Sequence, residues 1–371
     1  METSYTWHPG ARCVNPRWPL TPPILPDELF SSWLVRTAHA HGCLPSSLTG
    51  AVWPGSHAWS VDPDRAHPWA NLDRLSGMSG LSSHQLLAST LWPVMQRLHP
   101  RPVLQRSMYL PWILPLGCRS RSHAGGLMCC PDCIKSGVPH FLLQHRLAWH
   151  TACPWHNMLL IDRCVVCSSA LQPARLCVDR PLSECHQCGQ PLGKAALTPP
   201  VEAALTFQTF ADSASQSMPF YGRVPLGFSE WMCIARVMVS FLEQVTRHPS
   251  AGSHLFCEAM GVDLSQLQAS SLGLPFEYGT PSERAGLLGQ AWVIMQAGPE
   301  RFVESAAEAK LPVTSFPLPA VSVPDILHQM LSVLTNTPHK PGHMGLKRTH
   351  SPQEVWRRWH RLQRRTHRNG I

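Results

Sequence analysis

The sequence predicts a mainly α-helical protein with small zinc-ribbon insertions, and three observations lead to this fold class. Apolar residues recur at helical spacing on both sides of a central block of cysteines. Within that block, four pairs of cysteine or histidine residues have two residues between their members. Hydrophobic residues make up 44% of the 371 residues, enough for more than one core. We therefore expect an N-terminal helical, helix-turn-helix-like part, central tandem zinc ribbons and a C-terminal helical domain.

Two helical segments are expected before the cysteines. Residues 27–41 carry apolar side chains at helical spacing and end at Gly42, a residue type favoured just past a helix. A second region covers 71–76 and, after a glycine-containing turn, 82–98, where Pro93 should kink or split the helix. Helix, turn and helix outline a helix-turn-helix, whose second helix could enter a DNA major groove. The alternative is an ordinary helical hairpin, because that helix carries few cations.

The C-terminal half is also expected to be helical. Several of its apolar-periodic segments open with a proline or with a capping serine, aspartate or threonine. The predicted helices are residues 200–211, 229–246, 263–270, 281–297 and 299–309.

The cysteine spacing predicts two structural metal sites. Two ligands separated by two residues can point inward from one tight turn, and two such turns supply the four tetrahedral ligands of a closed Zn²⁺ site. A disulfide scaffold would need an oxidising compartment and is usually a short secreted chain. Pairing the turns in sequence order gives one site from Cys130, Cys133, Cys153 and His156, and another from Cys164, Cys167, Cys185 and Cys188.

Alternatives remain for both sites at this stage. Some of these cysteines could be buried thiols, and other residues could replace a ligand. The candidates are Cys129, His145 and His150 for the first site, and Cys177 and His186 for the second.

The positive charge of the chain is concentrated at its C-terminal end. The formal net charge is +8, and residues 347–371 hold eight basic residues against one acid, which leaves about +1 for the rest. Residues 351–371 predict an amphipathic helix with a capping box, suited to phosphates, an anionic membrane or an acidic partner. A solvated terminal helix is the alternative. We predict nucleic-acid binding by Lys347, Arg348, Arg357, Arg358, Arg361, Arg364, Arg365 and Arg368.

Catalytic signatures are missing from the sequence. The nearest approach to a phosphate loop, Gly189 to Lys194, is one residue short and lies within a cysteine turn. The metal sites would have no open coordination position, and the acids do not cluster. Neither an export signal nor an apolar run of membrane-spanning length is present. We therefore expect a cytoplasmic protein that is not an enzyme and has no membrane partner.

Composition and motif order suggest six parts of the chain. The two proline-rich stretches serve as an arm and a linker. The predicted parts are a Pro-rich arm (1–26), a helical or helix-turn-helix-like domain (27–117), a tandem zinc-ribbon domain (118–195), a C-terminal helical domain (196–310), a Pro-rich linker (311–350) and a basic tail helix (351–371).

Several motifs, in this order, resemble the TniQ family of bacterial transposition proteins. The resemblance is carried by the residues from about 23 to 195. Its motifs are Pro26 to Arg36 (PDELFSSWLVR), Pro111 to Gly117 (PWILPLG), Cys129 to Cys133 (CCPDC), Arg146 to His156 (RLAWHTACPWH), Leu160 to Cys167 (LIDRCVVC) and the Cys185 to Cys188 turn.

The resemblance implies a non-catalytic adaptor that selects target sites in DNA transposition and DNA recombination. Members similar to this chain link a target to an AAA+ ATPase regulator. They recognise that target as a DNA sequence or through a guide-RNA effector complex, and some act as homodimers. The family's zinc ligands carry over to the eight residues of the two predicted sites. The alternatives are a purely protein-binding module of an RNA-guided complex and a zinc-dependent DNA-binding regulator.

Overall fold

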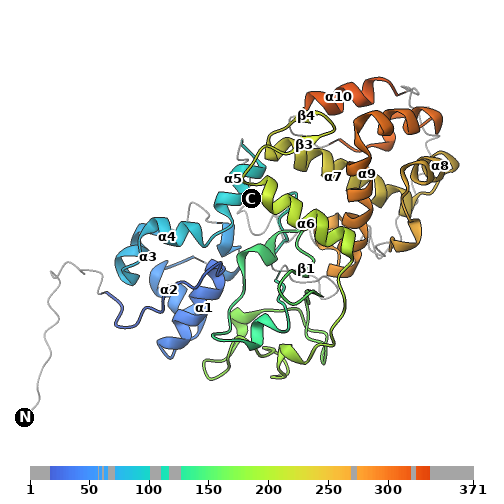
Figure 1. The fold of residues 1–371 in the computed structure, drawn as a ribbon. Helices are drawn as coiled ribbons and strands as arrows, with labels where there is room; N and C mark the ends of the chain where they lie inside the picture. The colour runs from blue at the N-terminus through green and yellow to red at the C-terminus, as the bar shows by residue number, and fades with distance from the viewer. Residues whose placement is uncertain are drawn as a thin grey trace, which may run out of the picture. The chain divides into compact units, whose positions relative to one another are not determined.

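The computed structural model describes most of the first 334 residues (Figure 1). The described residues are 17–56, 58–60, 62–65, 72–100, 110–116, 127–268, 274–318 and 323–334. All of them belong to one compact unit, Met1–Leu334, and a second unit, Thr335–Ile371, lies outside the described residues. The predicted basic tail helix falls in that second unit.

The protein is mainly α-helical, as predicted. The described part holds ten α-helices and two antiparallel hairpins with two-residue strands. The helices are α1 (Phe30–Ala40), α2 (Pro45–Val52), α3 (Leu72–Ser79), α4 (Ser83–Ala88), α5 (Trp92–Leu98), α6 (Glu202–Ala214), α7 (Phe228–Arg247), α8 (Ala251–Met260), α9 (Pro281–Glu308) and α10 (Asp325–Ser332). The strands are β1 (Ala152–Cys153) with β2 (Met158–Leu159), and β3 (Phe220–Tyr221) with β4 (Val224–Pro225).

The N-terminal helices follow the predicted pattern with one shift. Helix α1 occupies the predicted segment and buries its apolar face. Helices α3 and α4 contact each other across a turn in which Gly80 adopts a left-handed φ of 75°, a conformation that suits glycine. The predicted 82–98 helix is split, but the break lies before Trp92, and Pro93 is the second residue of α5. Proline is tolerated there because the first-turn N–H groups have no partner within the helix.

The C-terminal helices pack around the long helix α9, which contacts α6, α7, α8 and α10 (Figure 1). Gly298, at φ 84° and ψ 169°, breaks α9 just before Pro299, so the two predicted helices meet at a kink. At Gly286, a Cβ would lie 2.4 Å from the carbonyl oxygen of Gln266, so only glycine allows this close approach.

Three helices were missed and one predicted helix was wrong. The segment 263–270 holds only a 3-10 turn, Leu264–Gln266, within its described residues. The Asp263 carboxylate caps this turn by accepting hydrogen bonds from the amide and hydroxyl of Ser265. Helices α2, α8 and α10 were not predicted, and α10 lies inside the segment that had been assigned to a Pro-rich linker.

Buried apolar residues form three clusters, which define the cores used below. The main core runs from Leu91 to Leu334 and joins α5 to α10 with part of the cysteine block. The ribbon core combines Leu29 and Val35 with the rest of the cysteine block. The N-terminal core lies among α1, α2, α3 and α4. The cysteine block therefore contributes to two cores rather than forming one of its own.

The Pro111–Gly117 motif connects the N-terminal half to the C-terminal helices. The backbone N–H of Trp112 donates to Glu277 Oε1 at 2.9 Å, and its indole N–H donates to the Met232 carbonyl at 3.1 Å. Arg236 on α7 pairs with the same Glu277 at 3.1 Å. Trp112 is buried, and its φ of 69° is unusual for a bulky residue. These contacts explain why this motif adopts a strained backbone that the main core holds in place.

Candidate metal centres

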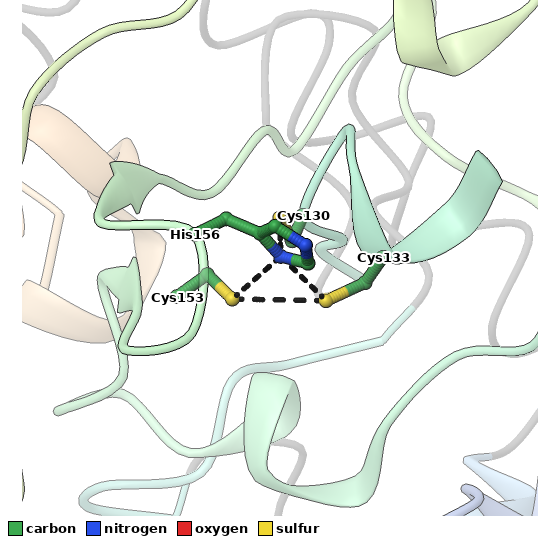
Figure 2. Close-up of side chains that lie close together, drawn as sticks. All are labelled: Cys130, Cys133, Cys153 and His156. Carbon is green, nitrogen blue, oxygen red and sulfur yellow. Dashed lines mark hydrogen bonds between the residues drawn. The ribbon is translucent and has the colours of Figure 1, made fainter. Parts of the chain in front are cut away.

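The first predicted site assembles from two turns that are far apart in sequence. The turn at Cys130 is closed by a hydrogen bond from the Ile134 N–H to the Cys130 carbonyl. The β1–β2 hairpin supplies Cys153 and His156, and Asn157 takes the left-handed conformation that closes the hairpin tip. All four side chains point toward one another (Figure 2).

The second predicted site is built from two turns of the same design. Ser168 and Gly189 follow their cysteine pairs in left-handed conformations and donate backbone hydrogen bonds to the Cys164 and Cys185 carbonyls at 2.8 and 2.9 Å. The glycine directly behind Cys188 is thus explained, because glycine adopts this conformation at little cost. The sulfur atoms of Cys164, Cys167, Cys185 and Cys188 form the second group of converging ligands.

The distances in both groups fit a tetrahedral Zn²⁺ ion. With Zn–S bonds near 2.3 Å and Zn–N bonds near 2.0 Å, two ligand sulfurs should lie about 3.8 Å apart, and a sulfur and a nitrogen about 3.5 Å apart. The Cys133 and Cys153 sulfurs are 3.6 Å apart, and His156 Nδ1 lies 3.2–3.5 Å from the three sulfurs of its group. In the second group the Cys164–Cys188 and Cys167–Cys185 sulfur distances are 3.7 and 3.6 Å. Both groups can therefore hold a metal ion.

Crowding of the sulfurs strongly separates their proton affinities. Hydrogen bonds from Cys130 and Cys133 lower the pKa of Cys153 to about 3, whereas side-chain contacts with Cys130 and Cys153 raise the pKa of Cys133. At the second group, burial raises the pKa of Cys164, but backbone N–H groups of Cys167 and Val166 outweigh burial and lower it to about 7. Each group thus holds a thiolate readily, and thiolates are the form that binds metal.

The alternative ligands lie outside both groups. Cys129 is adjacent to Cys130, but its backbone pairs with Ile161 as an extended bridge, and successive side chains of an extended segment point to opposite faces. Cys130 therefore enters the main core and Cys129 the ribbon core. His150 binds Asp212 instead of joining a cluster. His145, Cys177 and His186 also belong to neither group of converging ligands among the described residues.

A buried arginine ties the first site to the C-terminal helices. Arg284 of α9 is 1% exposed and donates to the backbone carbonyls of Ala148 and His150, which lead into the β1–β2 hairpin. Its second terminal nitrogen lies 2.8 Å from the Met128 sulfur, two residues before Cys130. Burial lowers the pKa of Arg284 to about 10, so the side chain is still charged at neutral pH. Both halves of the first site are thereby fixed to one helix.

A second buried arginine ties the same segment to the N-terminal helices. Arg146 is fully buried and pairs with Asp62 at 2.5 Å and with Asp64 at 2.6 Å. Asp64 also accepts hydrogen bonds from the backbone N–H and hydroxyl of Ser31 in α1. No local pattern in the sequence marks these residues, except that Arg146 belongs to the RLAWH motif.

The predicted nucleic-acid residues gain no structural support. The eight basic residues from Lys347 to Arg368 lie outside the described residues. The candidate recognition helix is split. Its first piece, α4, spans only six residues, and Arg97 lies on the separate helix α5 and donates to the Ser215 carbonyl. Helices α3 and α4 keep the helix-turn-helix outline, but α4 is shorter than a helix that would cross a groove.

Comparison with known proteins gives one family match. The family model TniQ matches residues 19–160. This part of the chain is similar to the TniQ family. That match spans the N-terminal helices and all four ligands of the first group. No curated protein matches the chain.

Within the described part of the chain, no helix combines the length and the apolar character needed to cross a membrane.

Proposed function

We propose that this chain is a member of the TniQ family and acts as a non-catalytic adaptor that connects target DNA, or a targeting complex bound to it, to an AAA+ regulator of transposition. The observation that carries the proposal is the family match over residues 19–160. The two closed ligand groups support it, because four protein ligands leave no position for a metal-activated water. The six-part division of the chain into arm, helical domain, ribbons, helical domain, linker and basic tail is part of this proposal.

A transposition assay tests the adaptor role. Cells carrying the transposase, the regulator and a marked element are compared with and without this chain, and insertion sites are sequenced. We expect insertions to concentrate at one class of target only when the chain is present. An unchanged distribution of insertions would contradict the proposal.

We further propose that the eight clustered residues bind two structural Zn²⁺ ions. Support comes from the donor set and the interatomic distances, which suit zinc. Cys133→Ser and His156→Ala should each reduce bound zinc from two equivalents to about one, measured by elemental analysis of the purified protein. Cys177→Ser, an exposed cysteine outside both groups, is the matched control and should keep two. Two equivalents in all three variants would refute the assignment of the first site.

A second candidate function is a purely protein-binding module within an RNA-guided targeting complex. It is favoured by the near-neutral charge of residues 1–346, since a surface that reads DNA usually needs a basic patch. Gel-shift assays of the purified chain separate the two candidates. Sequence-selective binding supports direct recognition of the target, and weak, salt-sensitive binding supports the module.

The basic tail is the proposed contact to DNA phosphates. Deleting residues 347–371 should weaken DNA binding and flatten its dependence on salt, because fewer counterions are released on binding. Equal slopes for the full chain and the deletion variant would exclude that role.

A further inference from the structure

A cleft of about 740 Å³ lies where several segments of the described unit meet. Its walls come from the segment 23–28, helices α4 and α5, the segment 143–149, helix α6 and the first residue of α7. This volume is within the range of roughly 300–1,000 Å³ of sites that bind small molecules or peptide segments. The ligands of both metal groups are absent from its lining.

The floor of the cleft is apolar and already formed. Val94, Leu147, Trp149 and Phe228 line it, although each is at least nine-tenths buried in the main core. A floor fixed by core packing needs little rearrangement to accept an apolar side chain, so the cost of ordering it on binding is low.

One carboxylate stands at this floor in a fixed orientation. Asp212 Oδ1 accepts hydrogen bonds from the Trp149 indole N–H at 3.0 Å and from His150 Nε2 at 2.9 Å. Both donors are buried, but the Asp212 side chain is 45% exposed. Among the described residues its second oxygen, Oδ2, has no hydrogen-bond partner. The negative charge is therefore held in place on a partly exposed side chain that lines the cleft.

The charge of the lining indicates what kind of partner would bind. Asp27 and Asp212 contribute two carboxylates, against one guanidinium from Arg97, which already donates to the Ser215 carbonyl. Glu28 also lines the cleft, but its buried carboxylate pairs with Arg36 at 2.6 Å. The remaining carboxylates favour a cation over a phosphate, and a preoriented carboxylate forms strong charge-assisted hydrogen bonds with lysine or arginine.

We propose that this cleft binds an extended segment of a partner protein in which a lysine or arginine, flanked by apolar side chains, places its cation on Asp212. The apolar neighbours of the cation would cover Trp149 and Phe228. The inference rests on the proposed function in one respect: the partner to be tested is the AAA+ regulator.

The test uses the full chain and overlapping 15-residue peptides that cover the regulator, with binding measured by fluorescence anisotropy. At least one peptide with a basic residue between apolar ones should bind. Asp212→Asn keeps an acceptor for Trp149 and His150 but removes the charge, and should weaken that peptide about tenfold to a hundredfold. Ala88→Trp, which fills the exposed rim of the cleft at the end of α4, should abolish binding. Glu202→Gln, an exposed charge on the same helix as Asp212 but outside the cleft, is the control.

A charge exchange distinguishes recognition from a structural effect. Asp212→Lys should bind the same peptide poorly, and should bind it better once its basic residue is replaced by glutamate. If the full-length regulator binds wild type, Asp212→Asn and Ala88→Trp equally well, the cleft proposal is overturned and the adaptor role stands. If the regulator does not bind wild type even with the target complex present, both proposals fall.

Discussion

The two four-ligand groups share a local design but differ in their surroundings. Cys130 and Cys153 of the first group are fully buried in the main core, together with helices α5 to α10. In the second group Cys164 and Cys185 are also buried, but they belong to the smaller ribbon core, which they share with one face of α1. Each group also has one exposed ligand, His156 in the first and Cys167 in the second. Local sequence thus sets the position of the ligands, whereas the neighbouring core sets how far the loss of a metal ion would spread.

The two sites also differ in whether the arginines near them are buried. The segment that leads into the first site carries Arg146, and Arg284 binds that segment from α9. Near the second site, Arg163 pairs with Asp162 but is 38% exposed. A buried guanidinium that loses its partners is costly, whereas an exposed pair contributes little to stability. We therefore expect the first site to be coupled to both helical parts of the chain.

The largest effect is expected when one ligand is removed from each site and the two variants are compared. Cys153→Ser should lower the free energy of unfolding by more than about 5 kcal/mol, because structural Zn²⁺ contributes roughly 10–16 kcal/mol of binding free energy. Hydrogen exchange should then accelerate in α6, α7 and α9. Cys185→Ser should accelerate exchange only around the ribbon core and α1. Equal exchange patterns in the two variants would remove the distinction between the sites.

The next effect concerns the buried ion-pair network. Arg146→Met leaves Asp64 buried without its cation, whereas Asp62 keeps its ion pair with Arg65, and should cost about 3–5 kcal/mol in chemical denaturation. The double variant Arg146→Met, Asp64→Leu should recover part of this loss, since it also removes the carboxylate that lost its cation. A double variant less stable than the single one would show that the network itself, and not the unpaired carboxylate, stabilises the fold.

A smaller effect is expected at Arg284. Arg284→Met leaves the Ala148 and His150 carbonyls without this donor and should cost about 2 kcal/mol, measured by urea unfolding. It should also speed zinc release from the first site more than from the second, followed with a colorimetric chelator. Arg301→Met, an exposed arginine on the same helix, should change stability by less than about 0.5 kcal/mol. Zinc release at equal rates from both sites would contradict the coupling.

The smallest effects are expected at the turn tips, where the two sites are alike. Trp155 is 65% exposed and Val166 is 58% exposed, although each lies between two ligands. Trp155→Ser and Val166→Ser should each change the free energy of unfolding by less than about 0.5 kcal/mol, measured by thermal unfolding, and should retain two zinc equivalents. Loss of zinc from only one of these variants would show that its tip stabilises the ligand turn.

Sequence reasoning worked best where the signal is local. The two-residue ligand spacing identified all eight converging residues, and apolar periodicity with capping signals located α1, α6, α7 and the two halves of α9. It failed at 263–270, where the Asp263 cap begins only a short 3-10 turn, Leu264–Gln266, within the described residues. It also passed over α8, although the Ser250 cap and Gly261 at its end were visible signals.

By itself, the sequence determined the helical class, the family resemblance and the composition of both ligand groups, because turns, caps and periodicity act over a few residues. The tertiary structure decided which core each group enters, why adjacent Cys129 and Cys130 face different cores, and where two arginines lie buried. It also placed Asp212 beside Trp149 and His150. These outcomes depend on contacts between segments tens to hundreds of residues apart, and no local pattern records such contacts.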